Sequence, residues 1–539
     1  MKPAISIKNL SYSYLGSVDK VLNNISLEVP QGSFFVFTGA SGGGKSTLLM
    51  LLRGFSHEIG GSVSGEIFVS GYDVFKTPIS KLGSTIGIVF QNPGLQLHQL
   101  KVFDEIMSAG IYRGVPLEEC RKKTRRLLND IVGEKIGEMS PEDLSGGQKQ
   151  KVALAASLMF DAPIMLLDEP FSFLDVKAKK ELLDILIGLN RQGKTIVIAT
   201  HDIGLVAKTA TGMAIIDRGG ILLAGNPQEV IYSHQMAQTA GMPLFAQIVH
   251  DAGSKESPLS WNELFDIKNL IKNNSIFQRK NAAHKNKLVE LSLENVGYYY
   301  SKSGFGIKNI TCDFYRGEIF GIIGANGSGK STLAKVIAGL LKSKSGRIIF
   351  NGKNFTALPD DERARHIGYA TQDPLDMFFE MTVSSEVSAG PKFLHYDIIK
   401  ERVEKILKEF FLWQYKSRHP DSISGGEKKR LGIADIVIND CDVILIDEPE
   451  FGLDRNNWKI ICDYLRGLAG RGKTIIIITQ DLEAAYLLCD RMGVVCGGEL
   501  VASAAPDIIF RDRALLDRSG LLVPEIANWQ ITFKNDINP

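Results

Sequence analysis

The most constraining feature of the chain is that it repeats itself. GASGGGKST at 39–47 recurs as GANGSGKST at 324–332, and IMLLDEP at 164–170 recurs as VILIDEP at 443–449. The motifs keep one order in both copies, and their spacing is far longer than the period of a solenoid repeat. The sequence therefore encodes a duplicated domain.

A third pair of motifs helps to place the domain boundaries. SGGQ at 145–148 recurs as SGGE at 424–427, with the same offset as the two acidic motifs. We expect domains at 1–250 and 288–539. The stretch between them, 251–287, is polar and rich in Asn and Lys, with a short amphipathic piece, and is typical of a surface linker.

Composition narrows the class of protein. The 539 residues carry 62 Lys and Arg against 61 Asp and Glu, so net charge gives no support to a nucleic-acid binder. The six cysteines are dispersed without a C-x-x-C pair, which argues against a zinc ribbon, an iron–sulfur cluster or a disulfide framework. With neither a signal-peptide pattern nor a membrane-length apolar stretch, we expect a soluble or peripheral protein of a reducing compartment.

Short apolar runs predict the fold of each half. FFVFTGA at 34–40 leads into a glycine loop and a helical pattern, while IMLLD and TIVIAT lack the polar alternation of half-exposed strands. Such runs alternating with helices predict an α/β fold. Each half should contain a doubly wound, mainly parallel sheet with a helical region inserted.

The glycine loops match G-x-x-x-x-G-K-[ST], a phosphate-binding pattern. Gly39 and Gly44 let the backbone turn its N–H groups toward a phosphate, Lys45 adds positive charge and Ser46 offers a hydroxyl to Mg²⁺. The predicted ATP-binding residues of the two loops are Gly39, Ala40, Ser41, Gly42, Gly43, Gly44, Lys45, Ser46 and Thr47, and Gly324, Ala325, Asn326, Gly327, Ser328, Gly329, Lys330, Ser331 and Thr332.

Two acidic residues end the same apolar run in each half. Asp168 and Asp447 close predicted buried strands, where an unpaired carboxylate is costly. Each is predicted to hold Mg²⁺ opposite the glycine loop. Glu169 and Glu448 follow and are predicted catalytic residues that orient or deprotonate the attacking water. A carboxylate merely satisfied at a strand end is the plainer alternative.

With these motifs on either side, LSGGQ at 144–148 resembles the signature of ABC-type ATPases, and the resemblance covers nearly the whole chain twice. It implies that each half is an ABC nucleotide-binding domain with a helical subdomain and a short C-terminal extension. It also implies that each ATP lies between one half's glycine loop and the other half's signature, Ser424, Gly425, Gly426 and Glu427 in site one and Ser145, Gly146, Gly147 and Gln148 in site two. Gln91 and Gln372 would join Ser46, Asp168, Ser331 and Asp447 around Mg²⁺.

The resemblance assigns further residues and shows that the halves differ. Tyr14 and Tyr300 would stack on adenine, whereas Tyr12 and Tyr298 would be core and Tyr299 is open to either role. His201, expected beside the γ-phosphate and the attacking water, has Gln480 as its counterpart, and Glu427 replaces the usual glutamine. We expect both sites to bind ATP and site one to hydrolyse it faster. Two comparable sites remain the alternative, since Gln keeps a donor.

The segments after the glutamines narrow the resemblance. Residues 372–387, QDPLDMFFEMTVSSEV, resemble the corresponding segment of energy-coupling-factor importer ATPases of the cobalt and vitamin type. Residues 91–106 match that segment more loosely. The tails that end both halves also resemble the C-terminal segment of those ATPases. This implies a peripheral subunit at the cytoplasmic face of the membrane, which works with a transmembrane coupling subunit and a small substrate-capture subunit and binds no nucleic acid. Leu95, Leu97, Phe378 and Phe379 would seat a helix of the coupling subunit, unless they are plain core.

Three other functions remain open from the sequence. A soluble tandem ABC protein acting on ribosomes or nucleic acid usually has a long charged linker, a cysteine cluster or a zinc module, none of which is seen. A non-hydrolysing regulator would not need both lysines together with Glu169 and Glu448. The ATPase of another ABC transporter class is the closest rival. The choice of transported substrate would lie in a partner protein.

Overall fold

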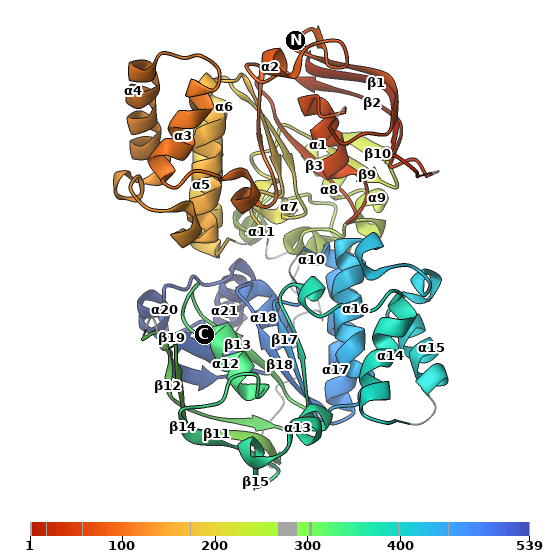
Figure 1. Ribbon diagram of the computed structural model, residues 1–539, viewed down its shortest axis with the longest axis vertical. Coiled ribbons are helices and arrows are strands. Elements are labelled where there is room, and N and C mark those ends of the chain that lie inside the picture. Colours follow the sequence, from red (N-terminus) through yellow and green to blue (C-terminus); the bar gives the residue numbers. More distant parts are fainter. Residues whose placement is uncertain are drawn as a thin grey trace. The chain divides into compact units, whose positions relative to one another are not determined.

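The computed structural model describes residues 3–17, 19–56, 58–172, 174–267, 288–300, 304–396, 399–450 and 452–537. The chain forms two compact units, Met1–Asn274 with Asp454–Asn456, and Ser275–Leu453 with Asn457–Pro539 (Figure 1). The predicted amphipathic piece of the linker contains helix α11 (Trp261–Asp266), which belongs to the first unit. The rest of the predicted linker, residues 268–287, lies outside the described residues.

A six-stranded sheet forms the centre of the first unit, in the order β10-β9-β3-β8-β7-β6. Neighbouring strands are parallel except for the β9–β10 pair. β3, β7 and β8 are buried along their whole length, which explains their apolar sequences. The strands span Phe34–Thr38 (β3), Ile86–Val89 (β6), Ile164–Asp168 (β7), Thr195–Ala199 (β8), Gly212–Asp217 (β9) and Gly220–Gly225 (β10).

A second, antiparallel sheet in the first unit has the order β2-β1-β4-β5. Its strands are β1 (Pro3–Ser13), β2 (Leu22–Pro30), β4 (Ser62–Val69) and β5 (Tyr72–Asp73). Helix α1 (Lys45–Arg53) contributes four leucines to the core that the two sheets share. The amino end of α1 is therefore held firmly at the carboxyl end of β3, where the glycine loop lies.

The inserted helical region has its own core. α3 (Val102–Ile111), α4 (Leu117–Leu127) and α5 (Gly146–Ser157) pack around Val102, Ile106, Leu128 and Val152, and stand together beside the sheets in Figure 1. α6 (Val176–Arg191) and α7 (Ile203–Val206) follow, and the unit ends in α8 (Pro227–Ile231), α9 (His234–Gln238) and α10 (Leu244–Asp251). The tail is fixed by buried side chains such as Phe245 and Ile248.

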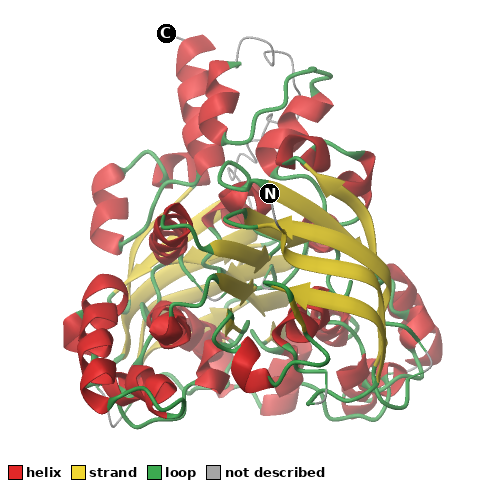
Figure 2. Cartoon of the chain, turned by 90° about the horizontal axis from the view of Figure 1, so that it is seen from above, coloured by secondary structure: helices red, strands yellow, loops and turns green. Residues whose placement is uncertain are grey.

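The second unit repeats this architecture, so the predicted α/β fold with two duplicated domains is confirmed. Its sheets have the orders β16-β17-β18-β13-β19-β20 and β12-β11-β14-β15. Figure 2 shows helices lying against strand layers in the chain. The strands are β11 (Val289–Tyr299), β12 (Gly306–Tyr315), β13 (Ile319–Ile323), β14 (Ser345–Phe350), β15 (Lys353–Asn354), β16 (Ile367–Ala370), β17 (Val443–Asp447), β18 (Thr474–Ile478), β19 (Arg491–Cys496) and β20 (Glu499–Ala504).

The helices of the second unit complete the match. They are α12 (Lys330–Ile337), α13 (Asp360–His366), α14 (Val383–Phe393), α15 (Ile399–Glu409), α16 (Gly425–Val437), α17 (Arg455–Gly470), α18 (Leu482–Leu488), α19 (Pro506–Ile509), α20 (Arg513–Ser519) and α21 (Glu525–Ile537). The C-terminal tail is packed through Trp529 and Tyr486, both buried. Among the described residues, no helix is both long and apolar enough to cross a membrane.

Candidate nucleotide site in each unit

The glycine loop of each unit wraps the amino end of a helix because its glycines approach other backbone closely. A Cβ at Gly39 would lie 1.9 Å from the carbonyl oxygen of Ile216, and one at Gly324 would lie 2.3 Å from that of Val495. Gly44 and Gly329 have φ of +103° and +108°, in the left-handed region that glycine adopts without strain. The loops therefore have the shape that presents successive N–H groups to an anion.

The loop lysines lie inside these turns. Lys45 Nζ donates to the carbonyl oxygens of Gly39 and Ala40 at 2.8 and 3.0 Å. Lys330 Nζ repeats the arrangement on Gly324 and Ala325 at 2.9 and 3.0 Å. Both side chains are buried, so each positive charge is concentrated at the centre of its loop.

The strand-end aspartates fit a cation partner. Ser46 hydrogen-bonds Asp168, and Ser331 hydrogen-bonds Asp447. Burial raises the pKa of Asp168 to about 6, against the opposing hydrogen bond of Ser46. Within the part of the chain that the structure describes, Oδ1 of Asp168 is buried without a hydrogen-bond partner. A hydroxyl beside a buried carboxylate with an unused oxygen suits Mg²⁺, which prefers oxygen ligands.

In the first unit, the predicted catalytic glutamate is paired with the predicted histidine. Glu169 follows β7 with φ of +44°, a left-handed conformation that its N–H bond to the Ala199 carbonyl, 2.8 Å long, helps to hold. His201 Nδ1 lies 2.9 Å from Glu169 Oε2. Burial disfavours the charged form of both side chains, but their mutual attraction and hydrogen bond have the larger effect. The pKa of Glu169 is therefore lowered and the pKa of His201 is raised. The imidazole therefore holds the carboxylate ionised.

In the second unit, amides replace the imidazole. Glu448 has φ of +47°, and the Nε2 atoms of both Gln480 and Gln372 donate to it, the latter at 3.1 Å. Burial, together with the neighbouring Asp447, raises the pKa of Glu448. Gln91, the first-unit counterpart of Gln372, has an exposed side chain at the end of β6. The two units thus bring the same glutamate to the same place with different partners and opposite pKa shifts.

Three further side chains around the second site have apolar or neutral counterparts in the first. The Tyr369 hydroxyl donates to Asp447 Oδ2 at 3.3 Å, and Lys429 Nζ donates to the Gln372 carbonyl at 2.5 Å. Thr479 Oγ1 donates to Glu450. Burial raises the pKa of Glu450 to about 8, with further contributions from the charges of Asp481 and Glu448. The aligned first-unit residues are Ile88, Gln150 and Phe171. Sequence reasoning missed all three, although the repeat alignment places apolar residues opposite Tyr369 and Glu450 and a neutral amide opposite Lys429.

The signature serines begin helices. Ser145 caps α5 and Ser424 caps α16, each accepting from the backbone of the third helical residue. In return Gln148 Oε1 accepts from the Ser145 N–H at 2.9 Å, and Glu427 Oε2 from the Ser424 N–H at 2.8 Å. Glutamate therefore performs the same capping as glutamine, and the glycines at the helix start stay free of side chains.

Of the two predicted adenine-stacking tyrosines, Tyr14 contacts the residue that ends its glycine-loop motif. Tyr14 is partly exposed, and its hydroxyl hydrogen-bonds Thr47 Oγ1 at 2.9 Å. Tyr300 is exposed to the same extent, while Tyr12 is buried and Tyr298 packs against the core of its unit. Tyr299 is more than half exposed and carries Lys344 over its ring.

Two buried glutamates hold the segment that follows each predicted Mg²⁺-binding glutamine. Glu105 Oε2 on α3 accepts from the backbone N–H groups of His98 and Gln99, both at 2.7 Å. Glu386 Oε2 on α14 does the same for Phe379 and Glu380 at 3.0 and 2.7 Å. Sequence reasoning used this stretch only for its resemblance. The repeated acidic residue in KVFDEI and MTVSSEV was the signal for its structural role.

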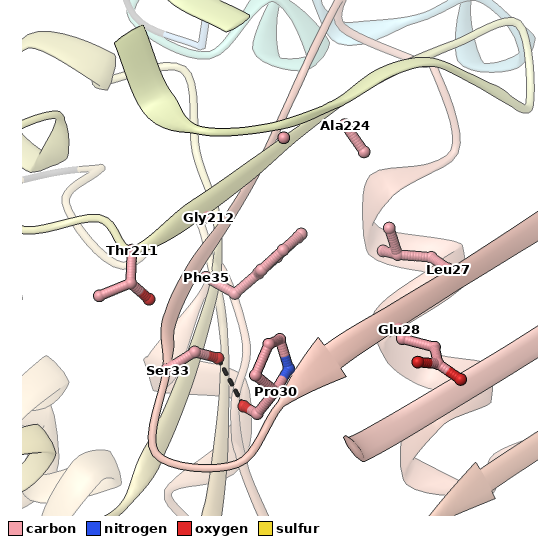
Figure 3. Close-up of a pocket in the computed structure, with 9 residues that line it drawn as sticks. Leu27, Glu28, Pro30, Ser33, Phe35, Thr211, Gly212 and Ala224 are labelled. Carbon is pink, nitrogen blue, oxygen red and sulfur yellow. Dashed lines mark hydrogen bonds between the residues drawn. The ribbon is translucent and has the colours of Figure 1, made fainter. Parts of the chain in front are cut away.

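A cavity of about 340 Å³ lies elsewhere in the first unit (Figure 3). It is bordered by Leu27 and Pro30 of β2, Phe35 of β3 and Ala224 of β10. Ser33 donates to the Pro30 carbonyl at 2.7 Å across its rim. The cavity lies at the amino end of β3, opposite the glycine loop, so it belongs to the junction of the two sheets.

Comparison with known proteins agrees with this geometry. The family model described as ABC transporter matches residues 22–172 and 307–450. The chain belongs to the ABC transporter family. An ABC transporter ATP-binding protein of Methanosarcina mazei is 31% identical over 96% of this chain and 92% of its own length, and one of Bacillus cereus is 32% identical over 94% and 92%. The solved structure of cbiO1 from Clostridium perfringens, part of the ABC transporter complex cbiONQ, is 30% identical, covers 46% of this chain and 99% of that chain, and has a TM-score of 0.39.

As an ABC ATPase, the chain has the groups that phosphoryl transfer requires. The loop N–H groups and Lys45 or Lys330 would bind the phosphates and neutralise their charge. Ser46 with Asp168, or Ser331 with Asp447, would hold Mg²⁺, which would supply positive charge against the phosphates. Glu169 and Glu448 stand next to these aspartates, where a carboxylate can orient an attacking water. The partners of each glutamate fix its direction and its charge.

Proposed function

We propose that the chain is the ATP-binding and hydrolysing subunit of a membrane importer of micronutrients, either vitamins or transition-metal ions. It would act at the cytoplasmic face of the membrane and work with a transmembrane coupling subunit and a small substrate-capture subunit. Family membership supports the ATPase part. The importer class rests on the likeness of 372–387 and of both C-terminal tails to energy-coupling-factor ATPases.

The observation that carries this proposal is a matched apolar surface beside each predicted Mg²⁺-binding glutamine. Leu95 and Phe379 are 75% and 76% exposed, and Leu100 and Met381 are 88% and 72% exposed. Leu97 is half-buried against the core of the helical region, and Phe378 is also half-buried. Leu100 and Met381 align in the repeat, whereas Leu95 and Phe379 lie three residues apart within the same segment. Exposed large apolar side chains in the same segment of both units are typical of a docking surface for a partner helix.

The anchoring of these segments supports a mechanical role. Glu105 and Glu386 tie each segment to the helical region. In the second unit the segment begins at Gln372, which contacts Glu448 next to the predicted metal site, and in the first unit it begins at the aligned Gln91. A movement of the glutamine on ATP binding or hydrolysis would thus be passed to the docking surface along one short segment of the backbone. We propose that ATP binding closes the two domains, with each ATP held by one glycine loop and the opposite signature, and that hydrolysis opens them.

Reconstitution tests this function. The chain would be purified with its membrane partners in detergent, identified by mass spectrometry, and placed in liposomes for ATP-dependent uptake of vitamins, Co²⁺ and Ni²⁺. Leu95→Asp with Phe379→Asp should abolish copurification and uptake while ATP binding by the isolated chain persists, and Leu222→Asp, exposed on β10, is the matched control. Association with ribosomes or nucleic acid, without any membrane partner, would refute the proposal.

A further inference from the structure

One buried cation in the second unit joins the signature helix to the predicted catalytic machinery. Lys429 lies on α16, which Ser424 caps, and its side chain is only 4% exposed. Its Nζ donates to the backbone carbonyl of Gln372 at 2.5 Å and to that of Asp447 at 3.5 Å. A single ammonium therefore bridges α16, the segment after β16 and the end of β17.

The contact made by the Gln372 backbone bears directly on its side chain. The Gln372 amide donates to Glu448 Oε2 at 3.1 Å, so fixing its carbonyl fixes the point from which the amide reaches the glutamate. Acidic groups face Lys429 from two directions, Asp373 after β16, and Asp447, Glu448 and Glu450 after β17. A buried lysine among these carboxylates is held by charge as well as by hydrogen bonds.

The first unit lacks this bridge. The aligned residue is Gln150, which is 2% exposed, and within the described residues its Nε2 has no hydrogen-bond partner. Gln91, in the place of Gln372, is exposed at the surface. A neutral amide thus folds in the same position of the same helix without making the link, which separates the linking role of Lys429 from a general packing role.

We propose that Lys429 is a positioning residue for ATP hydrolysis in the second unit. By holding the Gln372 carbonyl, it keeps the Gln372 amide on Glu448 and makes the catalytic carboxylate sensitive to movement of the signature helix. This inference rests on the proposed role of Glu448 in hydrolysis. In the first unit His201 contacts the glutamate, and among the residues that the structure describes the Gln150 amide nitrogen of the signature helix makes no such link.

The test uses the full chain in a Glu169→Gln background, so that turnover reports the second unit. Lys429→Gln introduces the residue that the first unit carries, Lys428→Gln removes the neighbouring charge as a matched control, and Lys429→Arg retains a buried donor cation. We expect Lys429→Gln to lower kcat about tenfold with KM changed less than about twofold, because a buried charged hydrogen bond is lost. Lys429→Arg should recover most of the loss, and Lys428→Gln should show none.

Hydrogen exchange without nucleotide gives a second readout. The amides of 371–380 should exchange faster in Lys429→Gln, while the β13 and β18 amides stay protected as in the parent. Unchanged exchange at 371–380, or a kcat equal to that of the control, would overturn the inference. Faster exchange throughout the second unit would also overturn it, by showing a structural role only. Failure of membrane transport would leave these results intact, so the two proposals fail separately.

Discussion

Replacing His201 by glutamine should give Glu169 the same partner that Gln480 provides for Glu448 in the second site. The perturbation removes the charge of the His201–Glu169 pair, whose atoms are 2.9 Å apart, and leaves an amide that can still donate, as Gln480 does to Glu448. A hydrogen bond between charged groups contributes roughly 1.5–3 kcal/mol, about twice a neutral one. The difference of about 1.4 kcal/mol corresponds to a factor of about ten in turnover.

The assay is steady-state ATP hydrolysis in a Glu448→Gln background, where only the first site turns over. His201→Gln should lower kcat about tenfold with little change in KM, because the pair acts on the glutamate rather than on ATP binding. The reciprocal change, Gln480→His in a Glu169→Gln background, should raise turnover of the second site. A kcat for His201→Gln within about twofold of its parent would refute this reasoning. Equal losses from Glu169→Gln and Glu448→Gln alone would remove the asymmetry between the sites.

Three more predictions follow from particular contacts. Glu450 has a pKa of about 8 in the folded chain against 4.5 in the unfolded chain, so folding favours its protonated form. The free energy of unfolding therefore falls as the pH rises from about 4.5 to 8. Glu450→Gln should therefore stabilise the chain at pH 8 but not at pH 4, as measured by denaturant unfolding; equal effects at both pH values would contradict this. Glu105→Ala leaves two amides unpaired, costs about 2 kcal/mol locally and should speed hydrogen exchange at 92–100, with Glu386→Ala doing so at 373–381. Gly39→Ala should abolish nucleotide binding by the first unit in equilibrium dialysis, because its Cβ would lie 1.9 Å from the Ile216 carbonyl oxygen.

The repeat and the apolar runs were enough to predict the fold. Strands such as IMLLD and TIVIAT are buried on both faces, so composition alone separates them from half-exposed strands. The backbone of the glycine loop could be predicted at Gly39 and Gly44, because the turn needs a close approach and a positive φ that glycine alone allows without strain. The domain end at 250 stays a prediction. Within the predicted linker, α11 buries Leu264, a packing contact that a polar composition does not indicate.

The surroundings of the catalytic glutamates could be predicted only in part. His201 and Gln480 stand out in the sequence because they follow matched strands, and the structure places both on their glutamates. Lys429, Tyr369 and Glu450 reach the second site from separate elements, so no local pattern joins them. Their contacts depend on how α16 packs on the sheet for Lys429, and on which strands are neighbours for Tyr369 and Glu450, and periodicity determines neither. Glu427, which replaces the usual glutamine of the signature, looked like a functional difference in the sequence. The structure explains it by a capping bond, since Glu427 accepts from the Ser424 N–H.

The most direct test of the account is a structure of the Glu169→Gln, Glu448→Gln double variant trapped with ATP and Mg²⁺. The account predicts one ATP at each glycine loop, with Ser424 and its glycines completing the site of Lys45, and Ser145 and its glycines completing the site of Lys330. It also predicts Ser46 with Asp168, and Ser331 with Asp447, at the metal. Two occupied glycine loops whose phosphates face solvent, with both signatures turned away from them, would contradict it.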